Sequence, residues 1–318
     1  MATDFPLADL DTWLADPKAL VWLDLLEPAD DMLQALAGEL KLDPLAVEDA
    51  VEPRERPKAT WHPNHLFLTC YSTKIVQIAG DGVEFQLGRV SAFVLHNALI
   101  TVRTDDRVDM DAILQRWTED GLLTFGVGAL VHGLLDELVD GHFATIETMD
   151  DQLEQLEDLL FDPQIKVRVI QQKVFQLRKA LVQLRRVVLP MREVVTSVMR
   201  FRSQDADKRT ASRQLDGNFN DLYDHVIRAS EWTESLRDMV TSVFETNLSL
   251  QDARLNEVMK KLAAWAAIIA VPTAVTGWFG QNLPYPGFSN DFGLLQSVLL
   301  ILVGTIGLYI LFRKVDWI

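Results

Sequence analysis

The feature that most constrains this chain is a pair of long apolar runs close to its C-terminal end. Residues Leu262–Phe279 form eighteen consecutive positions without a charged side chain, and Phe292–Phe312 form twenty-one more. A helix of either length is about long enough to cross the ~30 Å hydrocarbon core of a membrane. Helices buried inside a soluble protein are the alternative explanation for such runs.

Charge around the two runs favours the membrane. Basic residues flank the pair only on its outer sides, at Lys260, Lys261, Arg313 and Lys314, whereas the connecting segment Gly280–Asp291 has neither Lys nor Arg. Because positive residues stay on the cytoplasmic side, both ends of the pair are expected in the cytoplasm and the connection outside. The predicted parts are transmembrane helix 1 at 262–279, an outer loop at 280–291, transmembrane helix 2 at 292–312, and a basic tail at 313–318. The four basic residues are expected to form a ring near the membrane.

The composition limits the partners. A net charge of −16 argues against nucleic acid and favours the attraction of cations. The only cysteine, Cys70, excludes an internal disulfide, and no Cys or His pair has zinc-site spacing. The first seventeen residues are acidic and lack the pattern of a signal peptide, so the N-terminal part is expected to be cytoplasmic.

Residues 1–125 are predicted to form a cytoplasmic α/β domain. Short β-rich runs alternate there with two helical patterns, around Met32–Leu40 and Pro44–Val51, and turns are expected at Asp81-Gly82 and His96-Asn97. The expected strands are Val21–Leu25, Leu66–Tyr71, Glu84–Leu95 and Leu99–Arg103.

Helical patterns with sorted charge follow this domain. The stretch Trp117–Ile165 has twelve acidic residues and no Lys or Arg, whereas Pro163–Arg202 has ten basic residues and one acidic residue, Glu193. An antiparallel hairpin of an acidic and a basic helix, at 126–205, is the simplest arrangement.

A stalk helix is predicted at 206–261. Apolar residues recur at heptad spacing from Leu215 to Leu250, and neither Pro nor Gly interrupts Asn218–Val271. A helix over that stretch would be about 80 Å long at 1.5 Å per residue, so the stalk should continue into the first span. The predicted fold class is therefore α+β: a cytoplasmic α/β domain, a long helical stalk and two C-terminal transmembrane helices.

Several C-terminal motifs resemble the CorA family of metal-ion channels. They are Asn256–Leu262, Pro272, the Gly-x-Asn at Gly280–Asn282 and the basic-aromatic end Arg313–Trp317, with Asp221–His225 upstream. The resemblance implies a homopentameric funnel in a bacterial inner membrane, whose stalk helices become the pore lining, and passive flow of Mg²⁺ or Co²⁺. It also implies a role for Asp221 in a regulatory metal site between neighbouring subunits. The family's signature is Gly-Met-Asn, and the Gln281 found here weakens the argument for magnesium; zinc is associated with ZntB-like relatives.

Residues Gly280, Gln281 and Asn282 are the predicted selectivity loop. A ring of Asn282 carbonyls could hold a hydrated Mg²⁺ through its waters, although a simple polar turn is the alternative. Helical spacing from Asn256 places small or polar residues on one face, the positions that the family uses for its pore, although small residues also mark helix–helix contacts. The predicted pore-lining residues are Asn256, Met259, Ala263, Ala266, Ala270, Thr273 and Gly277.

His132, Asp136 and Asp140 lie at i, i+4 and i+8 on the acidic helix, as metal ligands on one face would. A solvated polar face is the other interpretation.

No enzymatic motif is present, and neither hydrolytic catalysis nor ATP-driven transport is expected. The predicted function is a divalent-cation channel, with Mg²⁺ and Co²⁺ first and Zn²⁺ or Ni²⁺ as further candidates, driven by membrane potential and gated by cytoplasmic metal. Its expected partners are further copies of itself and membrane lipid, with no nucleic acid and no cofactor beyond the transported and regulatory ions. A zinc transporter with the same fold, or a membrane-anchored coiled-coil scaffold or sensor, are the alternatives.

Overall fold

The structure, a computed structural model, describes residues 9–16, 18–52, 55–77, 83–119, 121–162, 164–204, 209–281, 284–288 and 290–318. Contacts between residues divide the chain into two compact units, Met1–Val243 and Phe244–Ile318. The division falls inside the segment predicted as the stalk.

The first unit contains a five-stranded mixed sheet with the order β1-β5-β4-β3-β2. Strand β1 runs parallel to β5, from Val21 beside Ala98 to Leu26 beside Arg103, and the other neighbours are antiparallel. The longest pairing joins β3 and β4 over twelve residues each. The strands are β1 Val21–Leu26, β2 Lys58–Trp61, β3 Leu66–Gln77, β4 Val83–Val94 and β5 Ala98–Arg103.

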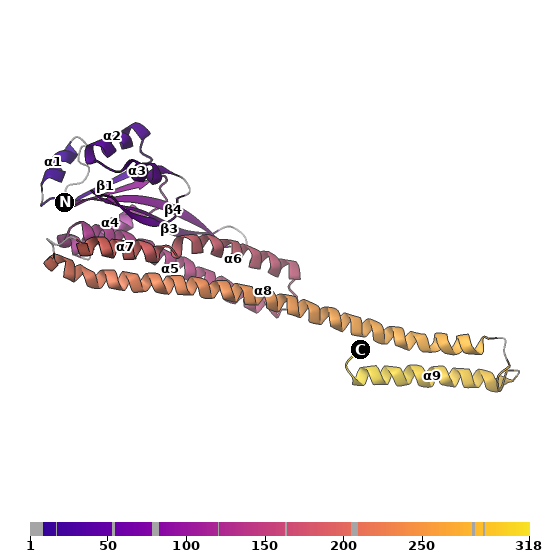
Figure 1. Cartoon of the computed structure of the whole chain (residues 1–318). Coiled ribbons are helices and arrows are strands. Elements are labelled where there is room, and N and C mark those ends of the chain that lie inside the picture. Colours follow the sequence, from indigo (N-terminus) through magenta and orange to yellow (C-terminus); the bar gives the residue numbers. More distant parts are fainter. Residues whose placement is uncertain are drawn as a thin grey trace. The chain divides into compact units, whose positions relative to one another are not determined.

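Alternation along the strands gives the sheet two apolar faces. In β3, Leu66 and Leu68 contribute to one core, whereas Phe67 between them contributes to the other. The second core is completed by α1 Leu10–Ala15, α2 Asp30–Leu40 and α3 Pro44–Val51. Figure 1 shows these three helices on the face of the sheet away from the long helices.

Helix α3 begins where its sequence predicts. The Asp43 carboxylate accepts hydrogen bonds from the backbone N–H groups of Leu45 at 2.9 Å and Ala46 at 3.4 Å, and Pro44 occupies the first helical turn, where no N–H is needed. The guanidinium of the buried Arg89 donates to the carbonyls of Ala50 and Glu52 at the other end of this helix. Strand β4 therefore fixes the C-terminal end of α3.

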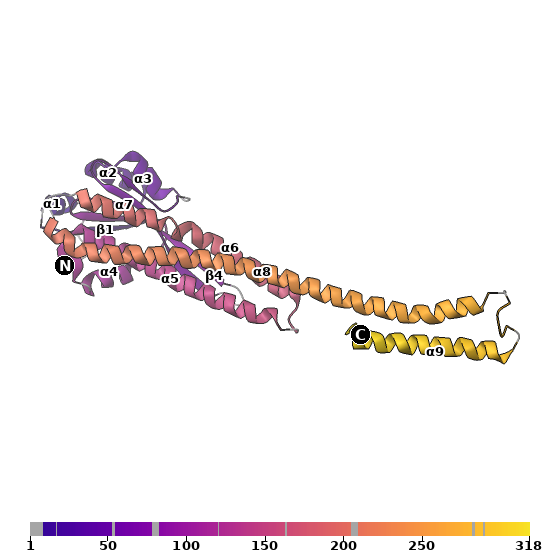
Figure 2. The ribbon, with the colours of Figure 1, turned by 60° about the horizontal axis from the view of Figure 1, so that its bottom comes forward.

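The opposite face of the sheet packs against the helices that follow it in the chain (Figure 2). They are α4 Met110–Glu119, the short 3-10 helix η2 Leu122–Phe125, α5 Val127–Leu160, α6 Val167–Val188, α7 Met191–Gln204 and α8 Arg209–Phe279. Apolar residues of α4, α5, α7 and α8 form the first core with β3, β4 and β5. Gly133 allows close packing of α5 against α4, because a Cβ at this position would come within 2.5 Å of the Trp117 ring. The indole N–H of Trp117 donates to the carbonyl of Leu130 at 3.1 Å.

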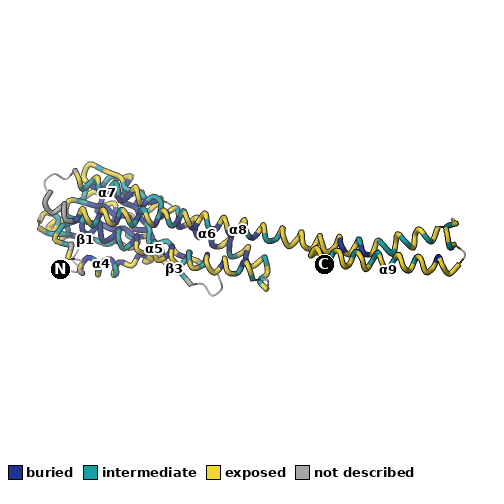
Figure 3. The backbone as a smooth tube through the Cα atoms, turned by 90° about the horizontal axis from the view of Figure 1, so that it is seen from below, coloured by how far each residue is buried: buried dark blue, intermediate teal, exposed yellow. Residues whose placement is uncertain are grey.

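The second unit contains the C-terminal part of α8 and α9 Asp291–Lys314. Both helices are long and apolar enough to cross a membrane. Only 11% of the best apolar window of the first helix and 0% of that of the second are buried, whereas the core helix of a soluble protein would be mostly buried. Figure 3 shows this exposure along both helices, in contrast to the buried segments around the sheet.

Most of these elements lie where the sequence predicts them, whereas the short helix η2 was not predicted. The predicted strands and the helices α2, α3 and α9 agree with the structure to within a few residues, but β3 is longer than expected. Strand β2 and helices α1 and α4 were not predicted. The turn expected at Asp81-Gly82 lies outside the described residues, whereas the one at His96-Asn97 closes with a hydrogen bond from Leu95 N–H to the Ala98 carbonyl at 2.8 Å.

Candidate functional site

The predicted pore-lining positions all lie on the C-terminal half of α8, and every one is exposed in the single chain. Between residues 256 and 279, Ala264 and Ile268 are the buried residues, at 0% and 6% exposure, and Val271 lies against Gly304 of α9. With 3.6 residues per turn, the contact face with α9 lies roughly opposite the face on which the predicted positions fall. One face of α8 therefore binds α9, and the other, of mainly small and polar side chains, has no partner within the described chain.

Two hydroxyl groups lie in the apolar span Leu262–Phe279. Thr273 Oγ1 donates to the carbonyl of Ile269 at 3.0 Å, and Thr276 Oγ1 donates to the carbonyl of Pro272 at 2.8 Å. A hydroxyl that donates its proton to the helix backbone keeps its oxygen lone pairs available as acceptors. Thr273 can thus present oxygen to a hydrated cation without breaking the helix.

The end of α8 is shaped by glycine. The N–H of Gly280 donates to the carbonyl of Thr276 at 2.8 Å, and a Cβ at Gly280 would come within 2.9 Å of that same oxygen. Gln281 follows with a hydrogen bond from its N–H to the carbonyl of Trp278 at 3.3 Å. The third member of the predicted selectivity loop, Asn282, lies outside the described residues.

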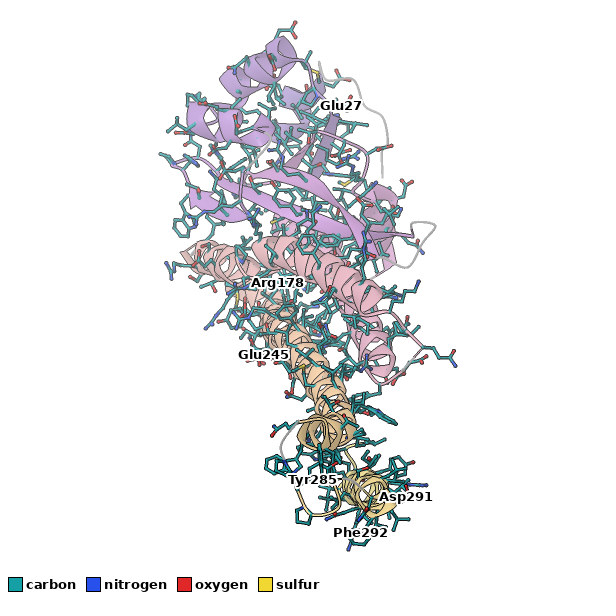
Figure 4. All side chains as sticks on the ribbon, turned by 90° about the vertical axis from the view of Figure 1, so that its right-hand side faces the viewer. Glu27, Arg178, Glu245, Tyr285, Asp291 and Phe292 are labelled. Carbon is teal, nitrogen blue, oxygen red and sulfur yellow. The ribbon has the colours of Figure 1, made fainter. Side chains whose placement is uncertain are left out.

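Aromatic rings hold the described part of the outer loop against the helix ends. The ring of Tyr285 makes edge contacts with Phe279 at 4.9 Å and Phe288 at 5.3 Å between centroids. Tyr285 is labelled beside the start of α9 in Figure 4, and a Cβ on Gly293 would lie 2.5 Å from the Gly287 carbonyl oxygen. These contacts pack the described residues 284–288 against the ends of the two helices.

The four predicted basic residues are exposed at the other end of the two helices. Lys261 Nζ pairs with Glu257 Oε1 at 2.7 Å, one turn earlier. Arg313 and Lys314 form the last turn of α9, and the ring of Trp317 stacks on Phe312 at 5.6 Å. Cationic groups beside an aromatic pair are typical of a membrane–water interface.

A second candidate site lies in the first unit, where α5 meets α8. One oxygen each of Asp136 and Asp140 and one imidazole nitrogen of His225 lie within 4.8 Å of one another. His225 Nε2 is 3.8 Å from Asp221 Oδ2, and Nδ1 of His225 is buried without a hydrogen bond. Adjacent ligands of a bound Mg²⁺ would be about 3 Å apart, so these groups would have to converge further around an ion.

Arg116 of α4 already supplies positive charge to this cluster. Its guanidinium pairs with Asp136 at 2.8 Å, Glu137 at 2.7 Å and Asp140 at 2.8 Å. Burial opposes the charge on Arg116, but the carboxylates, Asp140 first among them, raise its pKa above the ordinary value. Burial also raises the pKa of Asp136, against the opposing effect of Arg116. A divalent cation that binds here would therefore compete with Arg116.

The structure changes the predicted set of metal ligands on α5. His132 is 5% exposed, and its ring packs edge-on against Phe219 at 5.2 Å, so it belongs to the core. Asp136 and Asp140 do come together, with His225 of α8 rather than His132. Neither His225 nor Arg116 was predicted from the sequence as part of a metal site. The signal for His225 was its position four residues after Asp221, one turn along the same helix.

An α/β domain, a helix that continues from it into an apolar span, and a second span define a two-span membrane protein with a helical stalk. The family model described as "CorA-like Mg2+ transporter protein" matches residues 17–314. The chain therefore belongs to the CorA-like family, whose members are divalent-cation transporters rather than enzymes.

Individual relatives agree with this assignment. The chain is 26% identical over 309 residues to the cobalt/magnesium transport protein CorA of Methanocaldococcus jannaschii, covering 94% of this chain and 92% of that protein. It is 27% identical over 323 residues to the protein of the same name from Thermotoga maritima, covering 99% and 89%.

Solved structures share the fold. The complete structure of the CorA magnesium transporter from Methanocaldococcus jannaschii matches with a TM-score of 0.71 at 24% identity, over 93% of this chain and 91% of that one. The ZntB cytoplasmic domain from Vibrio parahaemolyticus matches with a TM-score of 0.57 at 12% identity, over 73% and 88%.

Proposed function

We propose that this chain forms a homopentameric channel for divalent cations, Mg²⁺ and Co²⁺ first, in a bacterial inner membrane with both chain ends in the cytoplasm. The observation that carries the proposal is the exposed face of α8 opposite its contact with α9. A single chain leaves that face without a partner, and two spans alone cannot enclose a path for water. Several copies around an axis turn the same face into the lining of a pore.

The proposed path suits an ion that keeps its water. Mg²⁺ loses its hydration shell reluctantly, and oxygen acceptors such as those of Thr273 and Asn282 can bind the waters rather than the ion itself. The small side chains of Ala263, Ala266 and Ala270 leave room for a hydrated ion. Entry into a cell that is negative inside is favoured by roughly 4.6 kcal/mol per 100 mV for a doubly charged ion.

Gating by cytoplasmic metal is the second part of the proposal. The cluster of Asp136, Asp140 and His225 joins α5 to α8, the helix that continues into the first span. Asp221 lies on the same helix one turn from His225 and is 73% exposed, so it is available to a neighbouring copy. An ion that binds better to the closed ring than to the open ring would shift the population toward the closed state.

Zinc remains a second candidate because of one observation. An imidazole in the cytoplasmic cluster suits Zn²⁺ or Co²⁺ better than Mg²⁺, which prefers oxygen ligands.

Metal flux into liposomes tests the proposal. Purified protein is reconstituted, and the entry of Mg²⁺, Co²⁺, Ni²⁺ and Zn²⁺ is followed one at a time under an imposed potential. We expect Asn282→Ala to abolish flux and leave the oligomer intact, because a methyl group offers no acceptor to the ion's waters. If this variant conducts as well as the wild type, the loop is a simple polar turn without a role in selectivity. If the wild type conducts none of the four ions, a membrane-anchored scaffold or sensor is favoured instead.

A further inference from the structure

The outer faces of α5 and α6 carry two stripes of exposed side chains with the same spacing. The acidic stripe consists of Glu147, Asp151, Glu154 and Asp158 on α5 and Phe161 directly after its end. On α6, the basic stripe is Arg168, Gln172, Phe175, Lys179, Val182 and Arg186. Every member is exposed, and each stripe follows steps of three and four residues, the spacing of a helix face that packs along its length.

The two stripes carry opposite net charge, and within the described part of the chain neither stripe neutralises its charge in an ion pair. Among the described residues, none of the charged members of either stripe takes part in an ion pair; the nearby Arg185, by contrast, pairs with Glu234 of α8 at 2.5 Å. Both stripes lie on the side of their helix away from the buried residues such as Leu153 and Leu177. The charge sorting that predicted an acidic–basic hairpin is therefore real, but the hairpin itself does not use it.

Apolar side chains in the stripes argue against simple solvation. Phe175 is 68% exposed, Val182 is 47% exposed, and Phe161 at the hairpin tip is 71% exposed. Apolar residues that recur between charges along one helix face are typical of a helix–helix contact.

We propose that the acidic stripe of one copy packs against the basic stripe of its neighbour around the ring. The inference rests on the proposed ring. A ring built from identical copies needs two different, complementary surfaces on each chain, and the two stripes are such a pair. The occupant of each stripe is thus a second copy of this chain.

The register of the contact follows from symmetry. Helices α5 and α6 are antiparallel, and we take the ring axis to run along them, so that rotation about it leaves every residue at its own height. Residues equally far from the hairpin tip therefore face each other between copies. The pairs are Asp158 with Arg168, Glu154 with Gln172, Asp151 with Phe175, and Glu147 with Lys179.

A disulfide between two differently labelled copies tests this register. Full-length chains carrying Glu147→Cys and Lys179→Cys, one change per chain, are co-expressed, purified from the membrane and oxidised mildly. Each chain then has one new thiol, so a bond between these thiols joins two copies. The native Cys70 is buried, and burial raises its pKa to about 12, so it does not compete.

The matched control is Gln155→Cys with Gln171→Cys. These residues are exposed, lie on the same two helices at matching heights, and fall beside the stripes rather than on them. We expect at least about tenfold more crosslinked dimer from the stripe pair, because a disulfide needs Cβ atoms within about 4.5 Å. Equal crosslinking of both pairs, or none from the stripe pair, would overturn the inference.

Charge reversal gives a second, independent measurement. Lys179→Glu should shift the salt concentration at which the ring dissociates in detergent to a lower value, and adding Glu147→Lys should restore it. An unchanged midpoint in the single variant contradicts the contact. If the wild type forms a ring that conducts metal but the stripe pair does not crosslink, this inference fails and the proposed function is retained. If the wild type is a monomer, both the inference and the proposed function fail.

Discussion

Gly304 of α9 lies directly against Val271 of α8, so close that a Cβ on the glycine would come within 2.8 Å of Val271 Cγ1. The pair fixes the side of α8 that α9 occupies, and thereby the side left for the proposed pore. Small residues permit such close approach of helices in a membrane, where packing rather than water drives association.

The first prediction is that Gly304→Val loosens this contact. The added methyl groups have no room, and overpacking of this kind costs typically 1–3 kcal/mol. We expect a lower temperature for loss of the oligomer in detergent, measured by size exclusion after heating. Gly307→Val is the control, because a Cβ there meets nothing within 4 Å. If both variants lost the oligomer at the same lower temperature, the close contact between Gly304 and Val271 would not be the cause of the loss.

Much of this architecture could be predicted because strong local patterns specify it. The uncharged runs, their basic flanks and the uninterrupted helix before Pro272 are properties of consecutive residues, and the structure has helices there. The β-rich run Leu66–Tyr71 likewise predicts a strand, and the structure has β3 there.

The missed elements depend on contacts that sequence order does not show. Strand β2 is only four residues long and exposes half of them, so it depends on its pairing with β3 and on the contact of Trp61 with Phe201 of α7. The cluster of Asp136 and Asp140 gains His225 from a helix about eighty-five residues away in the chain, and Arg116 from a third helix. Helical spacing suggested His132 as a ligand on the same face of α5 as Asp136 and Asp140. His132 is instead part of the core, because Phe219 of α8 covers its ring.

A second prediction concerns Arg116 and its three carboxylates. Arg116→Met keeps the apolar stem but removes the charge, so Asp136, Glu137 and Asp140 repel one another. Because these groups are partly exposed, we expect a loss of about 1–2 kcal/mol in local stability, read from hydrogen exchange of α4 and α5.

Divalent metal should reverse this loss, since an ion can then occupy the place of the guanidinium. Arg107→Met serves as the control: its pair with Asp105 is longer, at 3.6 Å, and the side chain is half exposed. Its effect should stay below about 0.5 kcal/mol and should not depend on metal. Metal-independent exchange in Arg116→Met would argue against an ion site at the cluster.

A third prediction concerns acid. His142 is 1% exposed and hydrogen-bonded through Nε2 to the carbonyl of Tyr71 at 2.8 Å, and burial lowers its pKa from 6.5 to about 4. Between pH 6.5 and about pH 4, His142 is therefore protonated in the unfolded chain and neutral in the folded chain. Stability is unaffected above pH 6.5, falls as the pH drops through this window, and has lost about 3 kcal/mol below pH 4.

His142→Gln should flatten this part of the stability curve, because the amide can still donate to Tyr71 but does not titrate. The measurement is the free energy of unfolding against pH between 7 and 4, in about half-unit steps. His96, which lies in an exposed turn, provides the control: His96→Gln should leave the acid limb of the wild type in place. An unaltered acid limb in His142→Gln would assign the loss to other groups.

The last prediction separates the two proposed roles of the stalk residues in gating. Asp221 offers only oxygen, whereas His225 offers nitrogen, and the two lie one turn apart on α8 at 3.8 Å. Mg²⁺ prefers oxygen, whereas Co²⁺ and Zn²⁺ also bind imidazole well. We therefore expect Asp221→Asn to weaken inhibition by every cytoplasmic divalent ion, since it removes a charge that all of them use. His225→Gln should raise the Co²⁺ concentration needed for half-inhibition by about tenfold or more and change that for Mg²⁺ much less.

Metal flux in membrane patches or liposomes with a controlled internal metal concentration measures both effects. The control is Asp238→Asn, which changes an exposed carboxylate further along the same helix. If both variants gave the same inhibition curves as the wild type for every ion, this cluster would be excluded as the regulatory site. The proposed pore would not be affected by that result, because the pore-lining face of α8 contains neither residue.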